Sequence, residues 1–116
     1  MYDNQNIFAK ILRNEIPCDK VYEDNVSLFF NDINPLTKVH VLGIPKISCV
    51  DYSDFIIKSH PETQTQFFKN INVVINKLNL ASSGYRLVSN SGMDGGQEVP
   101  HFHVHILGGE KVGPLK

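Results

Sequence analysis

The segment His101-Phe102-His103-Val104-His105-Ile106 alternates imidazole side chains with apolar ones, and we refer to it as the histidine segment. Successive side chains of a β-strand point to opposite faces of a sheet. This spacing therefore predicts a strand over residues 99–107 with the three histidines on one face. We expect the apolar residues on the other face to pack against a helix. Three adjacent histidines on one face are more than core packing requires, so the segment is a candidate functional site.

A long helix is predicted over residues 59–80. Its apolar stripe recurs at helical spacing and consists of Phe67, Phe68, Ile71, Val74, Ile75 and Leu78. Ser59 and Glu62 fit a capping box at the start of this helix, and Pro61 fits its first turn, where the missing N–H of proline does no harm. We expect this stripe to form the core surface on which the apolar side of the histidine segment packs.

The remaining segments are predicted to form short elements. A short helix is expected over residues 7–12, ending before Pro17, and residues 51–57 are expected to form a short helical turn. Strands are predicted over residues 20–23, 26–31, 39–45, 85–90 and 99–107. Asp24-Asn25 separates the first two strands, which predicts a hairpin and antiparallel pairing. We therefore expect one α+β domain over residues 1–116, with an antiparallel sheet, one long helix and one short helix.

The composition argues against several classes of protein. The 116 residues carry 11 Lys and Arg against 12 Asp and Glu, a formal charge of −1, so there is no basic excess for binding polymeric nucleic acid. No apolar run reaches the roughly 20 residues that span a bilayer, and residues 1–6 lack the positive charge of a signal peptide. Cys18 and Cys49 have no metal-ligand spacing and are expected to be reduced. We therefore expect a cytoplasmic protein with neither a membrane nor a nucleic-acid partner.

One interpretation of the histidine segment is a metal site, because neutral imidazole is a common zinc ligand. On an extended strand His101 and His105 lie about 13–14 Å apart, which is too far to share one ion. An adjacent pair such as His103 and His105 needs a third ligand, for which Glu110 and His40 are the candidates. The all-β cupins use a similar spacing, but the long predicted helix does not belong in such a fold. We therefore expect neither a metal nor another cofactor.

A second interpretation joins the histidines to the glycine-rich loop before them, residues 91–97. Gly92, Gly95 and Gly96 allow successive backbone N–H groups to converge on an anion without a lysine. A phosphate bound there would lie beside neutral imidazoles, whose reference pKa of about 6.5 makes them competent nucleophiles at neutral pH. A histidine that attacks phosphorus forms a phosphoramidate intermediate, while its neighbours stabilise phosphate oxygens and protonate the leaving group.

Motifs along nearly the whole chain resemble those of the histidine-triad (HIT) superfamily. In order they are Ile7-Phe8-Ala9-Lys10-Ile11, Glu15-Ile16-Pro17, Phe30-Asn31-Asp32-Ile33, Ile44-Pro45-Lys46, Asp94-Gly95-Gly96-Gln97 and His101-Phe102-His103-Val104-His105-Ile106-Leu107-Gly108-Gly109. The three histidines after Gly-Gly-Gln are the most specific of these motifs. Gly108-Gly109 is similar to the branch that contains nucleotide-binding and phosphoramidase-type members. The resemblance implies a small α+β fold that pairs as a homodimer.

The resemblance also implies a role for each histidine. His103 would be the nucleophile that attacks the α-phosphate of a purine nucleotide, His105 would contact phosphate oxygens, and His101 would support and orient the nucleophile. His40 matches a further histidine near the site. The implied reaction is hydrolysis of a nucleoside 5′-phosphoramidate or an acyl-nucleotide through a nucleotidyl-His103 intermediate. The alternatives are a regulatory module that binds nucleotides without catalysis and, less favoured by the residues, a zinc-binding protein.

The nucleotide-binding positions implied by the family fall into two groups. The positions around the phosphate and ribose are Asn90, Gly96, Gln97 and, as a ligand of the ribose hydroxyls, Asp32. The positions that match walls of the base pocket are Ile7, Phe8, Ile11, Phe30 and Ile33. Two positions depart from the family pattern. Glu98 stands where many relatives carry a small hydroxyl residue, and Asn31 replaces a histidine that several relatives place before the ribose aspartate.

Overall fold

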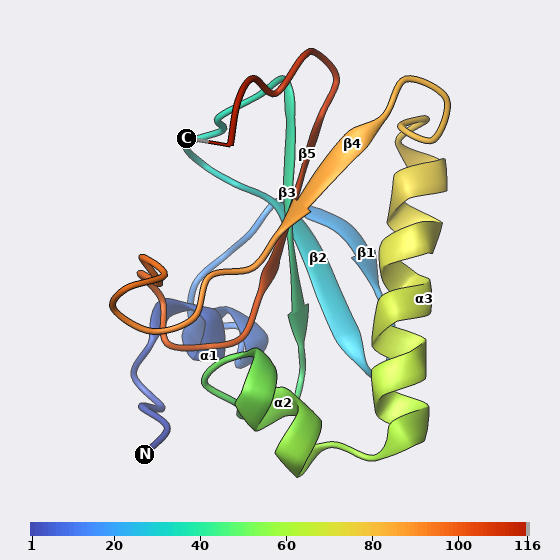
Figure 1. Ribbon diagram of the computed structural model, residues 1–116. Helices are drawn as coiled ribbons and strands as arrows, with labels where there is room; N and C mark the ends of the chain where they lie inside the picture. The colour runs from blue at the N-terminus through green and yellow to red at the C-terminus, as the bar shows by residue number, and fades with distance from the viewer. Residues whose placement is uncertain (116) are drawn as a thin grey trace.

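A five-stranded antiparallel sheet forms the centre of the molecule, with the strand order β1-β2-β3-β5-β4 (Figure 1). The structure is a computed structural model and describes residues 1–115. The strands are β1 (Lys20–Glu23), β2 (Ser27–Asn31), β3 (Val39–Pro45), β4 (Tyr85–Val88) and β5 (Val104–Gly108). The helices of the described residues are α1 (Ile7–Leu12), α2 (Tyr52–Lys58) and α3 (Pro61–Lys77). The predicted α+β class with an antiparallel sheet is confirmed.

The central strands of the sheet are buried on both faces. On one face Phe29 of β2 and Val41 of β3 belong to the hydrophobic cluster that includes the buried side of α3. On the other face Phe30 and Leu42 pack with Phe8 of α1. Because both faces are covered, residues 27–30 of β2 and 40–45 of β3 are continuously buried and do not alternate between buried and exposed positions.

The apolar side of the histidine segment packs on the long helix, as predicted. Phe102 lies with its ring centroid 5.0 Å from that of Phe55 in α2 and 5.7 Å from that of Phe67 in α3. Val104 and Ile106 belong to the same buried cluster. The alternation of the segment therefore places its apolar residues toward α3 and its histidines on the opposite face.

The histidine segment is only partly a strand, which corrects the prediction of a strand over residues 99–107. Strand β5 begins at Val104, which pairs with Gly43 of β3. Further pairing in this direction would approach Pro45, which has no N–H to donate. The N–H of Phe102 donates instead to the carbonyl of Cys49, at 2.9 Å. His101 and His103 thus lie in an irregular segment that keeps the alternation of a strand.

The start of α3 also differs from the prediction. The helix begins at Pro61, and its N-cap residue is His60, whose side chain makes no capping hydrogen bond. Ser59 belongs to the preceding helix α2, where it is the C-cap and its hydroxyl donates to the carbonyl of Phe55. Ser59 therefore does not form the predicted capping box. The predicted helical turn over residues 51–57 is the seven-residue helix α2, capped by the carboxylate of Asp51.

None of the helices within residues 1–115 combines the length and the apolar character needed to cross a membrane.

Candidate functional site

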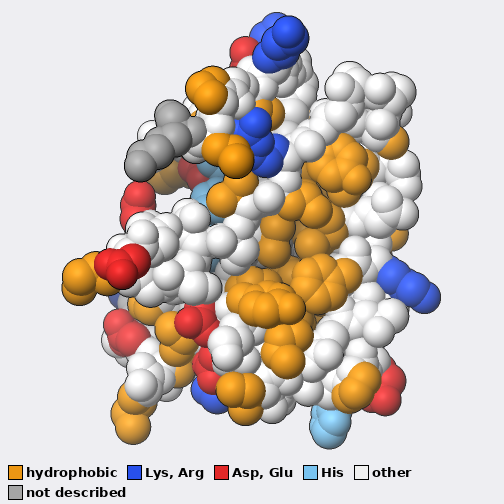
Figure 2. Space-filling model, viewed as in Figure 1, with side chains coloured by type: hydrophobic (Ala, Val, Ile, Leu, Met, Phe, Trp, Pro, Cys, Tyr) orange, Lys and Arg blue, Asp and Glu red, His pale blue; other side chains and the backbone are white. Residues whose placement is uncertain are grey.

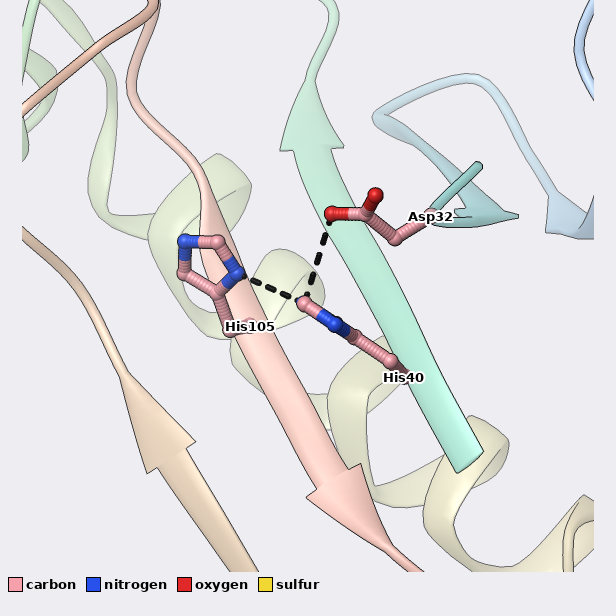
Figure 3. Close-up of side chains that lie close together, drawn as sticks. All are labelled: Asp32, His40 and His105. Atoms are coloured by element: carbon pink, nitrogen blue, oxygen red, sulfur yellow. Dashed lines mark hydrogen bonds and ion pairs between the residues drawn. The ribbon is translucent and has the colours of Figure 1, made fainter. Parts of the chain in front are cut away.

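The register of β3 and β5 brings two histidines together that are far apart in the sequence. Leu42 of β3 pairs with His105 of β5, so His40 is the diagonal neighbour of His105 on the same face of the sheet. The Nε2 atom of His40 lies 2.9 Å from Nδ1 of His105. Asp32, in the turn before β3, places its carboxylate Oδ2 3.4 Å from the same Nε2 atom (Figure 3). The structure thus brings together His40, His105 and Asp32, three of the residues that the resemblance assigns to the site.

A backbone hydrogen bond determines which nitrogen of His40 carries the proton. The N–H of Leu36 donates to Nδ1 of His40 at 3.1 Å, so the proton of the neutral ring is on Nε2. This Nε2–H points to His105 Nδ1 and Asp32 Oδ2, and His105 accepts it at Nδ1. The proton of neutral His105 is therefore on its own Nε2. That N–H is the donor that His105 offers to a ligand.

The adjacent backbone also fixes the tautomer of His103. Its Nδ1 lies 2.7 Å from the carbonyl oxygen of His101, and a carbonyl only accepts, so Nδ1 carries the proton. The lone pair of neutral His103 is consequently on Nε2. The ring is held edge-on between Phe8 and His105, with centroid distances of 5.0 Å to each. A neutral imidazole with one unprotonated nitrogen in a fixed orientation is what a histidine nucleophile requires.

His101 supports this arrangement from inside the protein. It is fully buried, and its Nε2–H donates to the carbonyl of Pro45 at 2.9 Å. Its Nδ1 accepts a hydrogen bond of 2.6 Å from the hydroxyl of Tyr2. Both ring nitrogens are thus used within the protein. The fixed ring of His101 orients its own backbone carbonyl, which binds His103. The hydrogen bond from Tyr2 to this ring was not predicted from the sequence.

Burial keeps all four histidines neutral. It lowers the pKa of His101 to about 4, against the opposing effect of the hydrogen bond to Pro45. Burial together with the neighbouring His103 and His40 lowers the pKa of His105 to about 4 as well. The pKa values of His103 and His40 are also lowered, mainly by burial. At neutral pH the site therefore has lone pairs and N–H donors in place of imidazolium charges.

His103 and His105 face a pocket of about 630 Å³. The predicted residues that line it are Phe8, Asp32, His40, Asn90, Gly96, Glu98, His103 and His105. These residues come from α1, the turn between β2 and β3, strand β3, the segment between β4 and β5, and strand β5, so the fold assembles most of the expected phosphate and ribose positions around one cavity.

Other predicted residues lie outside the lining of this pocket: Ile7, Ile11, Phe30, Asn31, Ile33, Gln97 and His101. Phe30 is a core residue that packs edge-on against Phe8 at 5.6 Å. Ile33 is 89% exposed in the turn after β2. The amide of Asn31 donates to the carboxylate of Asp19, away from the pocket.

The glycine-rich loop is closed by its own hydrogen bonds. The N–H of Gly96 donates to the carbonyl of Met93, and the N–H of Gln97 donates to the carbonyl of Gly92. The Gln97 side chain accepts the N–H of Gly92 and donates to the carbonyls of Val50 and Val99. These three N–H groups therefore do not form the anion-binding nest predicted for the loop. Gln97 is the residue that ties the loop to the body of the protein.

Several residues that line the pocket were not predicted as site residues. They include Arg86 of β4, residues of the turn before β3 and residues after β5, namely Leu36, Thr37, Val112, Pro114 and Leu115. The guanidinium of Arg86 donates to the carbonyl of Gly113 at 2.7 Å. The alternation of side chains along β4 could have predicted the position of Arg86. Paired residues of neighbouring strands face the same side of a sheet, and the partner of Arg86, Leu107 on β5, also lines the pocket. The segment after β5 has no periodic pattern that predicts its position.

The cluster of Asp32, His40 and His105 also has the compactness of a metal site, since its ligand atoms lie within 4.8 Å of one another. A metal ion on Nε2 of His40 would require the proton of the ring on Nδ1. The N–H of Leu36 already points at Nδ1, so two donors would face each other. Glu110, the other proposed ligand, accepts the N–H of Lys38. The arrangement therefore suits a shared proton better than a metal ion.

Comparisons with known proteins match nearly the whole chain. The family model of the HIT domain matches residues 13–112. An uncharacterized 13.2 kDa HIT-like protein of Azospirillum brasilense is 44% identical over 114 residues, covering 98% of this chain and 93% of that protein. The purine nucleoside phosphoramidase of Escherichia coli K12 is 38% identical over 111 residues, covering 96% and 92%. The solved structure of a HIT family hydrolase from Clostridium thermocellum has a TM-score of 0.83 at 36% identity, covering 97% and 96%.

Proposed function

This chain belongs to the HIT domain family, and from that premise we propose that it hydrolyses purine nucleoside 5′-phosphoramidates through a covalent intermediate on His103. The observation that carries the proposal is the hydrogen bond from His103 Nδ1–H to the His101 carbonyl, which leaves the Nε2 lone pair of a neutral imidazole at the pocket. The name of the Escherichia coli relative supports the substrate class. Acyl-nucleotides are the second substrate class that this chemistry allows.

In the first step Nε2 of His103 attacks the α-phosphorus. A P–N bond to His103 forms while the P–N bond to the leaving group breaks, and the leaving nitrogen takes up a proton from solvent and departs as an amine. The phosphorylated imidazole keeps its proton on Nδ1 and becomes positively charged. The carbonyl of His101 accepts that N–H, so the hydrogen bond becomes charge-assisted as the intermediate forms.

In the second step water attacks the same phosphorus. The P–Nε2 bond breaks and the water gives up a proton to solvent. His103 is regenerated as a neutral imidazole, and a nucleoside 5′-monophosphate is released. His105 Nε2–H is the donor proposed for a non-bridging phosphate oxygen in both steps. Its orientation depends on His40, so His40 is proposed as a positioning residue. The roles of Asp32 toward the ribose and of Phe8 toward the base are proposed from the family positions.

The experiment that tests this function uses adenosine 5′-phosphoramidate. We expect release of adenosine monophosphate and ammonia in equal amounts. Mass spectrometry of acid-quenched and base-quenched samples should show an adenylyl adduct on the peptide with His103, and the adduct should survive base better than acid, as a P–N bond to histidine does. Binding of the nucleotide without turnover or adduct would contradict the proposal and favour a non-catalytic binding module.

We also propose that two copies of the chain pair along β4. This strand lies at the edge of the sheet, so its outer backbone groups are open to another strand. Hydrophobic side chains gather on the face over β4, α2 and α3, and those of Leu87, Tyr52 and Phe68 are 43–52% exposed (Figure 2). An open edge beside an exposed apolar surface supports pairing with a second copy.

The pairing predicts a solution mass of about twice 13.1 kDa by light scattering. Leu87→Asp places a charge on the apolar surface and is expected to shift the mass to that of a single chain. Ile33→Asp is the matched control, because Ile33 is also an exposed hydrophobic residue but lies in the turn after β2. A mass of 13.1 kDa for the unsubstituted protein would contradict the pairing.

A further inference from the structure

A carboxylate lies at the pocket in which the proposed reaction takes place. Glu98 directly follows the glycine-rich loop, is exposed to solvent, and lines the same pocket as His103 and His105. Among residues 1–115 its carboxylate has no hydrogen-bond or ion-pair partner. The other pocket carboxylate, Asp32, is engaged by the N–H of Asn34 and faces His40. Glu98 is therefore the acidic group that is free to meet a substrate.

The charge of Glu98 reaches the proposed nucleophile. Burial lowers the pKa of His103, and the carboxylates of Asp32 and Glu98 act in the opposite direction. Glu98 also lines the same pocket as His103, so a substrate that His103 attacks shares this cavity with the Glu98 carboxylate. The leaving group departs from the phosphorus within that cavity.

The charges that line the pocket make the Glu98 carboxylate unfavourable for the binding of an anionic substrate that brings no hydrogen-bond donor or positive charge. The histidines that line the pocket are neutral because of their burial, so they offer donors but no positive charge. Arg86, the cationic residue of the lining, is bound to the carbonyl of Gly113. The two carboxylates of the lining, Asp32 and Glu98, still outnumber this one cation. A phosphate beside His103 therefore meets a net negative charge, unless the substrate itself brings a hydrogen-bond donor or a positive charge to Glu98.

We propose that Glu98 selects the leaving group, favouring nucleotides linked to an amine over nucleotides linked to a carboxylate. The selectivity rests on the proposed hydrolase function and specifies its substrate class. The nitrogen of a phosphoramidate carries an N–H that donates to the Glu98 carboxylate, and protonation on departure adds donors to the same atom. The oxygen of an acyl-nucleotide has no hydrogen to donate and gains negative charge as its bond to phosphorus breaks, so Glu98 repels it.

The test compares kcat/KM for adenosine 5′-phosphoramidate with kcat/KM for acetyl adenylate, after subtraction of the rates without protein. Glu98→Gln keeps the size of the side chain and removes its charge. We expect the ratio of the two constants, amine over carboxylate leaving group, to fall by at least about 10-fold, since a hydrogen bond to a charged group contributes about 1.5–3 kcal/mol.

Asp94→Asn is the matched control. This substitution removes the same charge from Asp94, which is exposed in the neighbouring glycine-rich loop and does not line the pocket. The ratio should therefore stay within about twofold of that of the unsubstituted protein. An unchanged ratio in Glu98→Gln, or an equal change in Asp94→Asn, would overturn the selectivity while the hydrolase function stands. Failure of the unsubstituted protein to turn over either substrate would overturn the proposed function, and the selectivity with it.

Discussion

Replacement of His103 by alanine is expected to reduce the hydrolysis of adenosine 5′-phosphoramidate by at least about 10³-fold. The substitution removes the Nε2 lone pair that the His101 carbonyl leaves free, and with it the covalent route. The neighbouring imidazoles do not replace it. His101 uses both ring nitrogens inside the protein, and His105 accepts from His40 at Nδ1 and carries its proton on Nε2. The measurement is steady-state release of adenosine monophosphate, followed over a range of substrate concentrations.

Two controls separate loss of the nucleophile from loss of the fold. His60→Ala removes an exposed histidine at the start of α3 and should leave turnover within about twofold of the unsubstituted protein. Adenosine monophosphate should still bind to the His103→Ala variant, because the rest of the pocket lining is unchanged. Turnover by His103→Ala within tenfold of the unsubstituted protein would rule out His103 as the nucleophile.

Replacement of Phe67 by alanine is expected to lower the free energy of unfolding by about 3–5 kcal/mol. Phe67 is fully buried, and its ring lies 5.4 Å from Phe55, 5.7 Å from Phe102 and 6.1 Å from Phe29, measured between centroids. The cavity would open where α3, α2, the sheet and the histidine segment meet. Since domains of this size are stable by about 5–15 kcal/mol, the loss is a large share of the total. Urea denaturation at constant pH measures it.

The neighbouring phenylalanine provides the matched control for this prediction. Phe68 is 43% exposed on the same helix, so Phe68→Ala should cost about 1 kcal/mol or less. Both variants are measured at two protein concentrations, because the unfolding of paired chains depends on concentration and loss of a subunit contact at Phe68 would change that dependence. Equal destabilisation by the two substitutions would show that the packing around Phe67 is not the stabilising feature we describe.

The sequence predicts the chemistry of the site well where a local pattern determines it. The two-residue period of the histidine segment places Phe102 toward the helices and His103 toward the pocket, and this holds even where the backbone is not a regular strand. The meeting of His40 with His105 is harder to predict, because it depends on the register of two strands that are 65 residues apart in the chain. The family resemblance places both histidines at the site but does not predict their contact.

Competition between alternative hydrogen-bond partners explains what the sequence did not predict. Ser59 fits the start of α3 by its neighbours alone, but it is already bound at the end of α2. The glycines of residues 91–97 permit an anion nest, but the side chain of Gln97 closes the loop. Asn70 interrupts the apolar stripe of α3 because it donates to Asp24 and Ser27 of the β1–β2 hairpin. The partners of Asn70 are distant in the sequence, whereas Ser59 and Gln97 each choose between local partners that the sequence does not rank.

The protonation pattern of the site is set largely by main-chain atoms. The N–H of Leu36 and the carbonyls of Pro45 and His101 assign the tautomers of His40, His101 and His103. Every residue has a carbonyl and every residue except proline has an N–H, so replacing the side chains at these three contact points by alanine would leave the groups in place. Alanine scanning would therefore pass over part of the proposed catalytic apparatus. Leu36→Pro, or an ester in place of the amide bond before Leu36, removes the N–H that directs the proton of His40.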